Sequence, residues 1–391
     1  MTPLRRTRTA ALAMAAGILL AACGSSDEVG GGEPAGGELP GGTEGWATDF
    51  SQHSVPLEEF MSGGPPKDGI PAIDEPRFVE IEEADSFLEP NEPVAVLEVN
   101  GVARAYPIQI LVWHEIVNDE LAGEPVAVTF CPLCNSTVAF SREVDGQTLD
   151  FGTTGRLRNS DLVMYDRQTE SWWQQLTAEA VVGEMTGSTL EVLPSQILSW
   201  AEVKRAHPDA DVLSRDTGFS RDYGTNPYAG YDDPGSQPFL LEEEADDRLP
   251  PKERVTAVQL DETAVVYPFS RVADEAPIND DIGGTPAVVL FDPAVASALD
   301  DEAIADSRDV GAAAVFDRRV EGRELSFEPG TTPGTARDRE TGSTWDITGR
   351  ATAGPLEGTE LEQIASDDQF WFAVAAFFPE VEVRGPSGGS S

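Results

Sequence analysis

The chain has 391 residues, with 26 Lys and Arg against 70 Asp and Glu, which gives a formal net charge of −44 at pH 7. This charge repels phosphate backbones and anionic lipid headgroups, so the composition excludes nucleic-acid binding and adhesion to membranes through basic patches. Hydrophobic residues make up 40% of the chain, with 17 Phe and 7 Trp, which excludes wholesale disorder. The length suggests two or three domains.

The first 23 residues have the pattern of a secretory signal peptide. Arg5, Arg6 and Arg8 precede an apolar run that is too short for a stable membrane span. The run ends at Cys23 after Leu-Ala-Ala, which resembles the lipobox of prokaryotic lipoproteins, where the cysteine receives lipid through its sulfur. We therefore predict a lipoprotein signal peptide over residues 1–23, lipidation of Cys23, and an exported protein that this lipid anchors to the cell membrane, facing outside the cytoplasm.

Low-complexity segments flank the part of the chain that can fold. Residues 24–54 are rich in Gly, Glu and Pro, which predicts a disordered tether, and residues 385–391 form a polar, flexible tail. Everything between them has the apolar content of folded domains.

An internal repeat organises this central part of the chain. Tyr106-Pro107 recurs as Tyr267-Pro268, and Asn118 recurs as Asn279, with the same spacing of 161 residues in each case (267 − 106 and 279 − 118). Further on, Phe140 corresponds to Phe316, so the spacing has grown to 176 (316 − 140). The second copy therefore carries an insertion of about fifteen residues, which we place at the acidic, Ala-rich residues 294–309.

The repeat predicts two related domains, called here the front half (residues 55–214) and the rear half (residues 255–384). The Tyr- and Pro-rich connector between them (residues 215–254) has enough aromatic residues to pack on a surface. Apolar runs at 94–99 and 126–130 predict strands, 137–142 and 148–151 predict a hairpin about Asp145-Gly146, and 108–117 and 197–206 predict helices. The fold class expected is α+β and predominantly β, with tandem domains of mostly antiparallel sheet and a few covering helices.

With Cys23 assigned to lipid, the remaining cysteines form the motif Cys131-Pro-Leu-Cys134 at the end of an apolar strand. Such a pair in an exported chain is a structural disulfide, a reversible redox couple or half of a metal site. The helix that follows the second cysteine in a thioredoxin fold is missing here, because residues 135–142 continue as strand and hairpin. In the rear half, Asp292 stands at the position of Cys131, and Glu275 at that of His114. This joint loss favours one site that uses His114 and both thiols.

Two chemical roles suit these three side chains. His114 could act as a general base that raises the thiolate fraction of the pair. Alternatively, Cys131, Cys134, His114 and Met164 could form a soft ligand set for copper(I) or another soft metal ion. A histidine that is merely hydrogen-bonded beneath Trp113 is the structural alternative, and with only three histidines in the chain a three-histidine zinc centre is not expected.

Several of the chain's scarce cations follow the thiol pair. Arg142, Arg156 and Arg158, together with Asn159 and Asp161, are candidates for binding an anionic substrate in a locally positive pocket. A second group of residues, Asp166, Arg167 and Trp173, recurs in the thiol-free rear half as Asp338, Arg339 and Trp345, which favours a role in the fold.

Long motifs in the front half resemble the prokaryotic family known as domain of unknown function 3179. These motifs are WHEIVND at 113–119, CPLCN at 131–135, NSDL at 159–162 and MYDR at 164–167, and the likeness extends from residue 68 over most of the mature chain. The family has no settled activity, and some relatives are described as selenoproteins with selenocysteine in the thiol motif. If that carries over to Cys131 or Cys134, the resemblance favours redox or soft-metal chemistry over an inert disulfide. The rear half departs from the pattern because it lacks Cys and His.

Three functions remain open from the sequence. The first is a thiol oxidoreductase in which one sulfur of Cys131 and Cys134 attacks, the other resolves, and His114 assists proton transfer. The second is a soft-metal binding protein that uses the same residues with Met164. The third is a non-enzymatic ligand-binding or interaction module with a structural disulfide. The expected partners are the membrane, through the lipid, and a small molecule, metal ion or redox protein.

Overall fold

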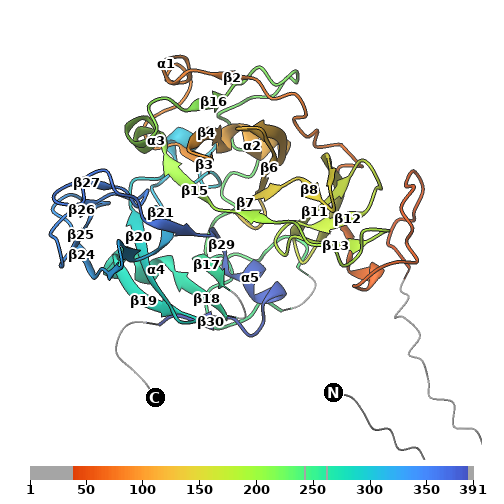
Figure 1. Ribbon diagram of the computed structural model, residues 1–391. Helices are drawn as coiled ribbons and strands as arrows, with labels where there is room; N and C mark the ends of the chain where they lie inside the picture. The colour runs from red at the N-terminus through yellow and green to blue at the C-terminus, as the bar shows by residue number, and fades with distance from the viewer. Residues whose placement is uncertain (1–37, 242–243, 261–262, 386–391) are drawn as a thin grey trace, which may run out of the picture. The chain divides into compact units, whose positions relative to one another are not determined.

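The computed structural model describes residues 38–241, 244–260 and 263–385, and these described residues form one compact unit. The predicted signal peptide, Cys23 and the first part of the tether lie outside the described residues. Among the helices of the described part, none is long and apolar enough to cross a membrane. The described chain is predominantly β with a few short helices, which confirms the predicted fold class (Figure 1).

The front half builds three sheets and one hairpin. The first sheet has the order β15-β3-β4-β16-β2, the second β14-β7-β6-β5, and the third β1-β10-β11-β12-β13. The elements are η1 (Leu57–Glu59), β1 (Met61–Ser62), β2 (Phe78–Val79), α1 (Ile81–Ala84), β3 (Pro93–Val99), β4 (Val102–Pro107), α2 (Ile108–His114), β5 (Ile116–Leu121), β6 (Glu124–Cys131), β7 (Ser136–Ser141), β8 (Glu143–Val144), β9 (Gln147–Thr148), β10 (Phe151–Arg158), β11 (Asp161–Asp166), β12 (Trp172–Gln174), β13 (Glu179–Val182), β14 (Val192–Leu193), β15 (Ser195–Ser199), α3 (Trp200–Ala206) and β16 (Asp211–Leu213).

The rear half repeats this plan. Its sheets have the orders β29-β17-β18-β30, β19-β20-β21-β28 and β24-β25-β26-β27. The elements are β17 (Arg254–Leu260), β18 (Thr263–Pro268), α4 (Phe269–Glu275), β19 (Ile278–Ile282), β20 (Thr285–Asp292), η2 (Ile304–Asp306), β21 (Ala312–Asp317), β22 (Arg319–Val320), β23 (Arg323–Glu324), β24 (Phe327–Pro329), β25 (Ala336–Asp338), β26 (Thr344–Trp345), β27 (Ala351–Ala353), β28 (Glu362–Ile364), β29 (Ser366–Phe370), α5 (Trp371–Phe377) and β30 (Glu382–Val383).

The two halves share their strand pairings. β3-β4-α2-β5-β6-β7 corresponds to β17-β18-α4-β19-β20-β21, and the hairpin β8-β9 corresponds to β22-β23. The pairings are antiparallel with one repeated exception, because β16 pairs parallel with β4, as β30 does with β18. The halves therefore have like topology, although both lie in the single compact unit. The predicted domain boundaries stay predictions.

Two of the predicted helices are shorter in the structure. The helix predicted over 108–117 ends at His114, because Glu115 adopts a left-handed conformation with φ 60° and the chain continues as β5. The helix predicted over 197–206 begins only at Trp200, because residues 195–199 form β15 and pair with β3. In the second case Ser199 caps the helix by accepting a hydrogen bond from the Glu202 amide, so the cap falls later than the apolar spacing indicated.

The hairpin about Asp145-Gly146 is present, but its strands are only two residues long. β8 pairs with β9 through Glu143 and Thr148, and the strand predicted over 148–151 does not form as one piece. The amide of Leu149 instead bonds the carbonyl of Arg142, and β10 begins at Phe151. This break separates the hairpin from the long pair β10-β11.

The hydrophobic core of the front half lies between these sheets, and it contains both cysteines. Cys131 and Cys134 are buried together with the apolar side chains of α2, β5, β6 and β7. Tyr223, Tyr228 and Tyr231 of the connector pack against the same cluster. The connector is thus part of the packed structure of the front half.

Candidate functional site

The thiol pair occupies the tight turn between β6 and β7. Cys131 is the last residue of β6 and pairs with Ser136 of β7, and the turn closes with Asn135 in the left-handed region at φ 54°. Both thiols are free, and both are at most 1% exposed. Each sulfur donates to the same acceptor, the carbonyl oxygen of Ser160, at 3.9 Å from Cys131 and 3.5 Å from Cys134. The turn therefore points both sulfurs at one spot on the neighbouring turn between β10 and β11.

Asp161, the first residue of β11, completes a cluster with the thiols. The preceding residues Asn159 and Ser160 both have positive φ, and this sharp turn brings the Asp161 carboxylate beneath the sulfurs. The Sγ atoms and a carboxylate oxygen of Asp161 all lie within 4.8 Å of one another. Two soft donors and one oxygen donor in this arrangement could hold a metal ion.

The hydrogen bonding of Asp161 is incomplete. Its Oδ2 accepts from Gln174 Nε2 at 2.6 Å and from the Leu176 amide at 3.1 Å, whereas its buried Oδ1 has no partner. Burial raises the pKa of this carboxyl to about 6 and raises the pKa of both thiols above their usual range. The cluster therefore disfavours charge in the metal-free state, and one buried acceptor in it is left unsatisfied.

Glu115 is a buried acid next to this cluster that the sequence analysis did not single out. It ends α2 in the left-handed region, is 8% exposed, and has no hydrogen bond to its side chain among the contacts of the described residues. Burial, with a smaller contribution from the Asp161 charge, raises the pKa of Glu115 to about 8. The only signal in the sequence is its place directly after His114 in the WHEIVND motif, and Ala276 stands at this position in the rear half.

A mainly apolar pocket of about 350 Å³ lies beside the cluster. Glu115 lines it, together with Leu133 from the turn between the cysteines and Leu162 from the residue after Asp161. Tyr228 and Tyr231 of the connector form another part of its wall. The pocket is thus lined by residues adjacent in sequence to Cys134 and Asp161, whereas neither cysteine nor Asp161 lines it.

His114 uses both ring nitrogens away from the thiols. Its Nδ1 lies 2.7 Å from the carbonyl oxygen of Pro71, and its Nε2 lies 2.7 Å from the hydroxyl of Tyr223. The ring also packs beside Phe219, and burial lowers the pKa of the imidazole. His114 is absent from the metal-capable cluster found among the described residues, which consists of Cys131, Cys134 and Asp161. Its predicted part in catalysis stays a prediction.

The other predicted site residues have varied surroundings. Arg142 is buried and donates to the carbonyls of Val126, Leu149 and Asp119, and Arg318 of the rear half makes the matching bond to Leu325. Because both halves have this contact, we assign the Arg142 side chain to the scaffold that the two halves share.

Arg156, Arg158 and Met164 lie around the cluster but outside it. Arg156 lines the pocket and donates to the Pro40 carbonyl, whereas Arg158 pairs with Glu59 at 2.6 Å. Met164 is buried in the same hydrophobic cluster as the cysteines. Of the predicted substrate-binding residues, the structure brings Asp161 to the sulfurs themselves.

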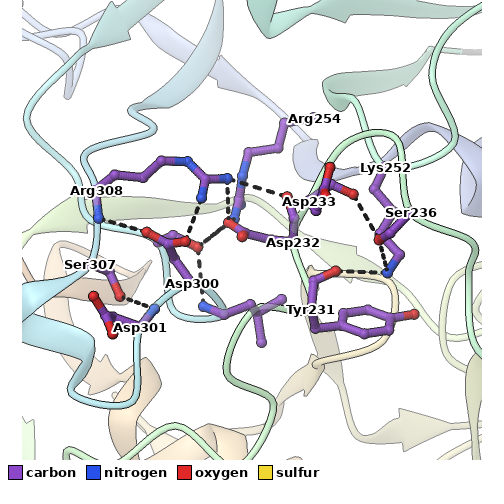
Figure 2. A network of polar contacts seen from close by, with 12 residues as sticks. Tyr231, Asp232, Asp233, Ser236, Lys252, Arg254, Asp300, Asp301, Ser307 and Arg308 are labelled. Atoms are coloured by element: carbon purple, nitrogen blue, oxygen red, sulfur yellow. Dashed lines mark hydrogen bonds and ion pairs between the residues drawn. The ribbon is translucent and has the colours of Figure 1, made fainter.

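The connector and the rear-half insert cover the thiol site from outside. Figure 2 shows Asp232 of the connector between two guanidinium groups, those of Arg254 at 3.1 Å and Arg308 of the insert at 3.0 Å. Lys252 donates to the Tyr231 carbonyl at 2.7 Å, and the Tyr231 amide donates to the Leu299 carbonyl of the insert. Leu299 is buried in the same cluster as the cysteines. Segments beyond the front half thus bury its thiols.

The comparisons with known proteins agree with the motifs. The family model described as "Protein of unknown function (DUF3179)" matches residues 67–381, so the chain belongs to this family. No curated protein and no solved structure matches the chain.

Proposed function

We propose that this DUF3179 member binds one thiophilic metal ion through Cys131, Cys134 and Asp161. The observation that carries the proposal is the carboxylate of Asp161, which lies within 4.8 Å of both sulfurs, interacts with the Cys134 thiol, and has a buried Oδ1 without a hydrogen bond of normal geometry. An unsatisfied buried acceptor costs about 1–3 kcal/mol, and a bound cation would remove that cost. Two thiolates held by one four-residue turn would supply two further ligands.

The donor set favours a borderline ion such as Zn(II) over copper(I). Zinc accepts thiolate sulfur at about 2.3 Å and carboxylate oxygen at about 2.0–2.2 Å, so tetrahedral ligand atoms lie roughly 3.5–3.8 Å apart. The spacing of the three side chains is compatible with this after small adjustments. Metal binding would also displace the thiol protons, which burial otherwise retains. Copper(I) is the softer alternative, and it would leave the carboxylate unused.

Competition titration with a chromophoric chelator tests the proposal on the full chain. We expect the wild type to bind one Zn(II), Cys131→Ser or Cys134→Ser to abolish tight binding, and Asp161→Asn to weaken it by at least about tenfold. The matched control is Asp292→Asn, which changes the rear-half counterpart of Cys131 and should leave the affinity unchanged. Retention of wild-type affinity in both cysteine variants would refute the proposal.

A thiol–disulfide exchange function is the second candidate. It is favoured by the convergence of both sulfurs on the Ser160 carbonyl, which places them within 4.8 Å of each other. In this reaction the two thiols would form one S–S bond, and their two electrons and two protons would pass to a disulfide of a partner protein. The raised pKa of both thiols opposes it, because the thiolate is the attacking species.

Redox titration of the metal-free chain separates this function from metal binding. A measurable Cys131–Cys134 redox couple in a series of glutathione buffers, together with no metal in the protein as purified, would favour exchange. The predicted role of His114 is tested by His114→Gln, which should slow thiol exchange if the imidazole takes the proton and should leave Zn(II) affinity unchanged.

We further propose that the protein is exported and held at the membrane by lipid on Cys23. The support is the lipobox-like end of the predicted signal peptide and the Gly-rich tether that follows it. Growth with a radiolabelled fatty acid should label the wild-type chain and leave Cys23→Ser unlabelled. Equal labelling of both would overturn this localisation.

A further inference from the structure

A second pocket, of about 340 Å³, lies between the two halves, and none of Cys131, Cys134 and Asp161 lines it. β7 and β14 of the front half form one side of it, and β17, β18, β29 and α5 of the rear half form the other. Figure 1 shows β7 beside β29 and β17 near the middle of the molecule. Most of its wall is apolar, as in Ala139, Leu193, Val258, Val265, Val374 and Phe378. Neither half alone could form this cavity.

Two polar residues of β29, Asp367 and Gln369, face this apolar cavity. They are two positions apart on one strand, so their side chains lie on the same face. The Oδ1 atom of Asp367 accepts from the Thr137 amide at 3.0 Å, but its buried Oδ2 has no partner. The buried Oε1 of Gln369 is also without a partner. Two buried acceptors on one strand of this wall therefore lack a hydrogen-bond partner.

The charge of the cavity is one-sided. Asp367 is the only charged side chain that lines it, and no Lys, Arg or His is among its described lining residues. Burial, reinforced by the neighbouring charge of Asp368, raises the pKa of Asp367 well above its usual range. A carboxylate in this position lacks a counter-charge, and a bound cation would supply it.

The repeat shows that the carboxylate of Asp367 and the amide of Gln369 are replaced by other side chains in the front half. Trp200 and Trp371 are counterparts 171 positions apart (371 − 200), so Asp367 corresponds to Gln196 and Gln369 to Leu198 of β15. The strand pairings agree, because Gln369 pairs with Val255 as Leu198 pairs with Val94. The rear half thus has an acid where the front half has the amide Gln196, and an amide where the front half has the apolar Leu198.

We propose that the pocket between the halves binds a small organic ammonium ion, with Asp367 and Gln369 accepting hydrogen bonds from the ammonium group and the apolar wall holding its hydrocarbon part. A primary ammonium has three N–H donors, which suits two converging acceptors, and the cavity has the size of a small-molecule site. The net charge of −44 would attract such cations towards the protein. None of the three proposed metal ligands lines this pocket, although the lining residue Leu176 donates its amide to Asp161 and the Asp161 charge contributes to the raised pKa of Asp367.

Calorimetric titration of the full chain with n-hexylammonium tests the proposal, with 1-hexanol as the neutral ligand of like shape. We expect saturable one-to-one binding of the ammonium and at least about tenfold weaker binding of the alcohol. Asp367→Asn, which keeps the volume and the acceptor for Thr137, should weaken ammonium binding by at least about tenfold, and Gln369→Leu, which installs the front-half residue, by about threefold or more. Asp292→Asn is the control for loss of one negative charge elsewhere, and thermal unfolding establishes that each variant is folded.

The salt dependence separates the pocket from general attraction to an acidic surface. Binding in a buried site should persist at about 0.5 M NaCl, whereas attraction to exposed carboxylates is screened. Absence of binding at millimolar n-hexylammonium, equal affinity for 1-hexanol, or an unchanged affinity in folded Asp367→Asn would each overturn the proposal.

Discussion

The front and rear halves keep the same polar contacts wherever the scaffold needs them. Tyr106 donates to Asp119 at 2.7 Å in the front half, and Tyr267 donates to Asp280 at 2.8 Å in the rear half. Trp173 donates to Asp166 at 2.9 Å, and its counterpart Trp345 donates to Asp338 at 3.0 Å. The Tyr–Asp bond joins strands of two sheets and the Trp–Asp bond joins neighbouring strands of one sheet in each half, so both bonds belong to the scaffold that the halves share.

The halves differ in the turn that follows β6 and β20. In the front half, residues 132–135 close this turn and hold the thiol pair, whereas in the rear half residues 293–311 replace it with a long insert. That insert contacts the connector and packs into the core around the thiols. The comparison indicates that one half carries the thiol cluster while the other covers it.

The largest effect on stability is expected from substitutions at matching scaffold positions, where we predict the same loss in the front and rear halves. Asp166→Ala and Asp338→Ala should each lower the free energy of unfolding by about 3–5 kcal/mol, because each leaves a buried Trp N–H and a Thr amide without an acceptor. Denaturant unfolding of the two variants measures the costs. A large loss in one variant and none in the other would contradict the shared-scaffold interpretation.

The front half has a buried acid, Glu115, where the rear half has Ala276, and the pH dependence of stability in Glu115→Gln tests the cost of burying this acid. The folded-state pKa of Glu115 is about 8 and its ordinary value is 4.5, so folding favours the protonated acid. The stability that this group contributes is fully present below pH 4.5 and is lost as the pH rises to about 8. The metal-free variant should therefore gain up to ~4 kcal/mol over the wild type at pH 8 and almost nothing at pH 4.5. A stability difference that is independent of pH would rule out this burial cost.

A smaller effect is expected from Asn118 and Asn279, which share a role but differ in burial. Each exchanges two hydrogen bonds with the first residue of the following long strand, Phe151 or Phe327. Asn118 is buried and also donates to Asp74, whereas Asn279 is exposed. Alanine at these positions should cost about 2 kcal/mol for Asn118 and about 1 kcal/mol for Asn279. A reversed order in denaturant unfolding would show that burial does not set the cost.

The sequence predicts the repeat and the fold class because both depend on patterns that recur at a fixed spacing. Helix ends were less predictable: residues 197–199 belong to a segment whose apolar spacing suits a helix, and only their pairing with β3 makes them part of a strand. Tertiary context decides such short segments.

The site was predicted in part. The thiol turn and Asp161 were singled out from the motifs, but their approach depends on the turn between β10 and β11, in which Asn159 and Ser160 both have positive φ. The position of His114 could not be predicted, because its ring is held by Tyr223 of the connector, 109 residues away in sequence. Asp367 could not be singled out from the sequence either, because its carboxylate is buried only when the two halves pack together.

Extended X-ray absorption at the zinc edge of the loaded full chain tests the central claim most directly. The account predicts two sulfur ligands at about 2.3 Å, with oxygen or nitrogen ligands at about 2.0 Å. In the double variant Cys131→Ser, Cys134→Ser, the zinc should have no sulfur ligands. A zinc environment made of oxygen and nitrogen alone in the wild type would place the metal on the acidic surface and contradict the account.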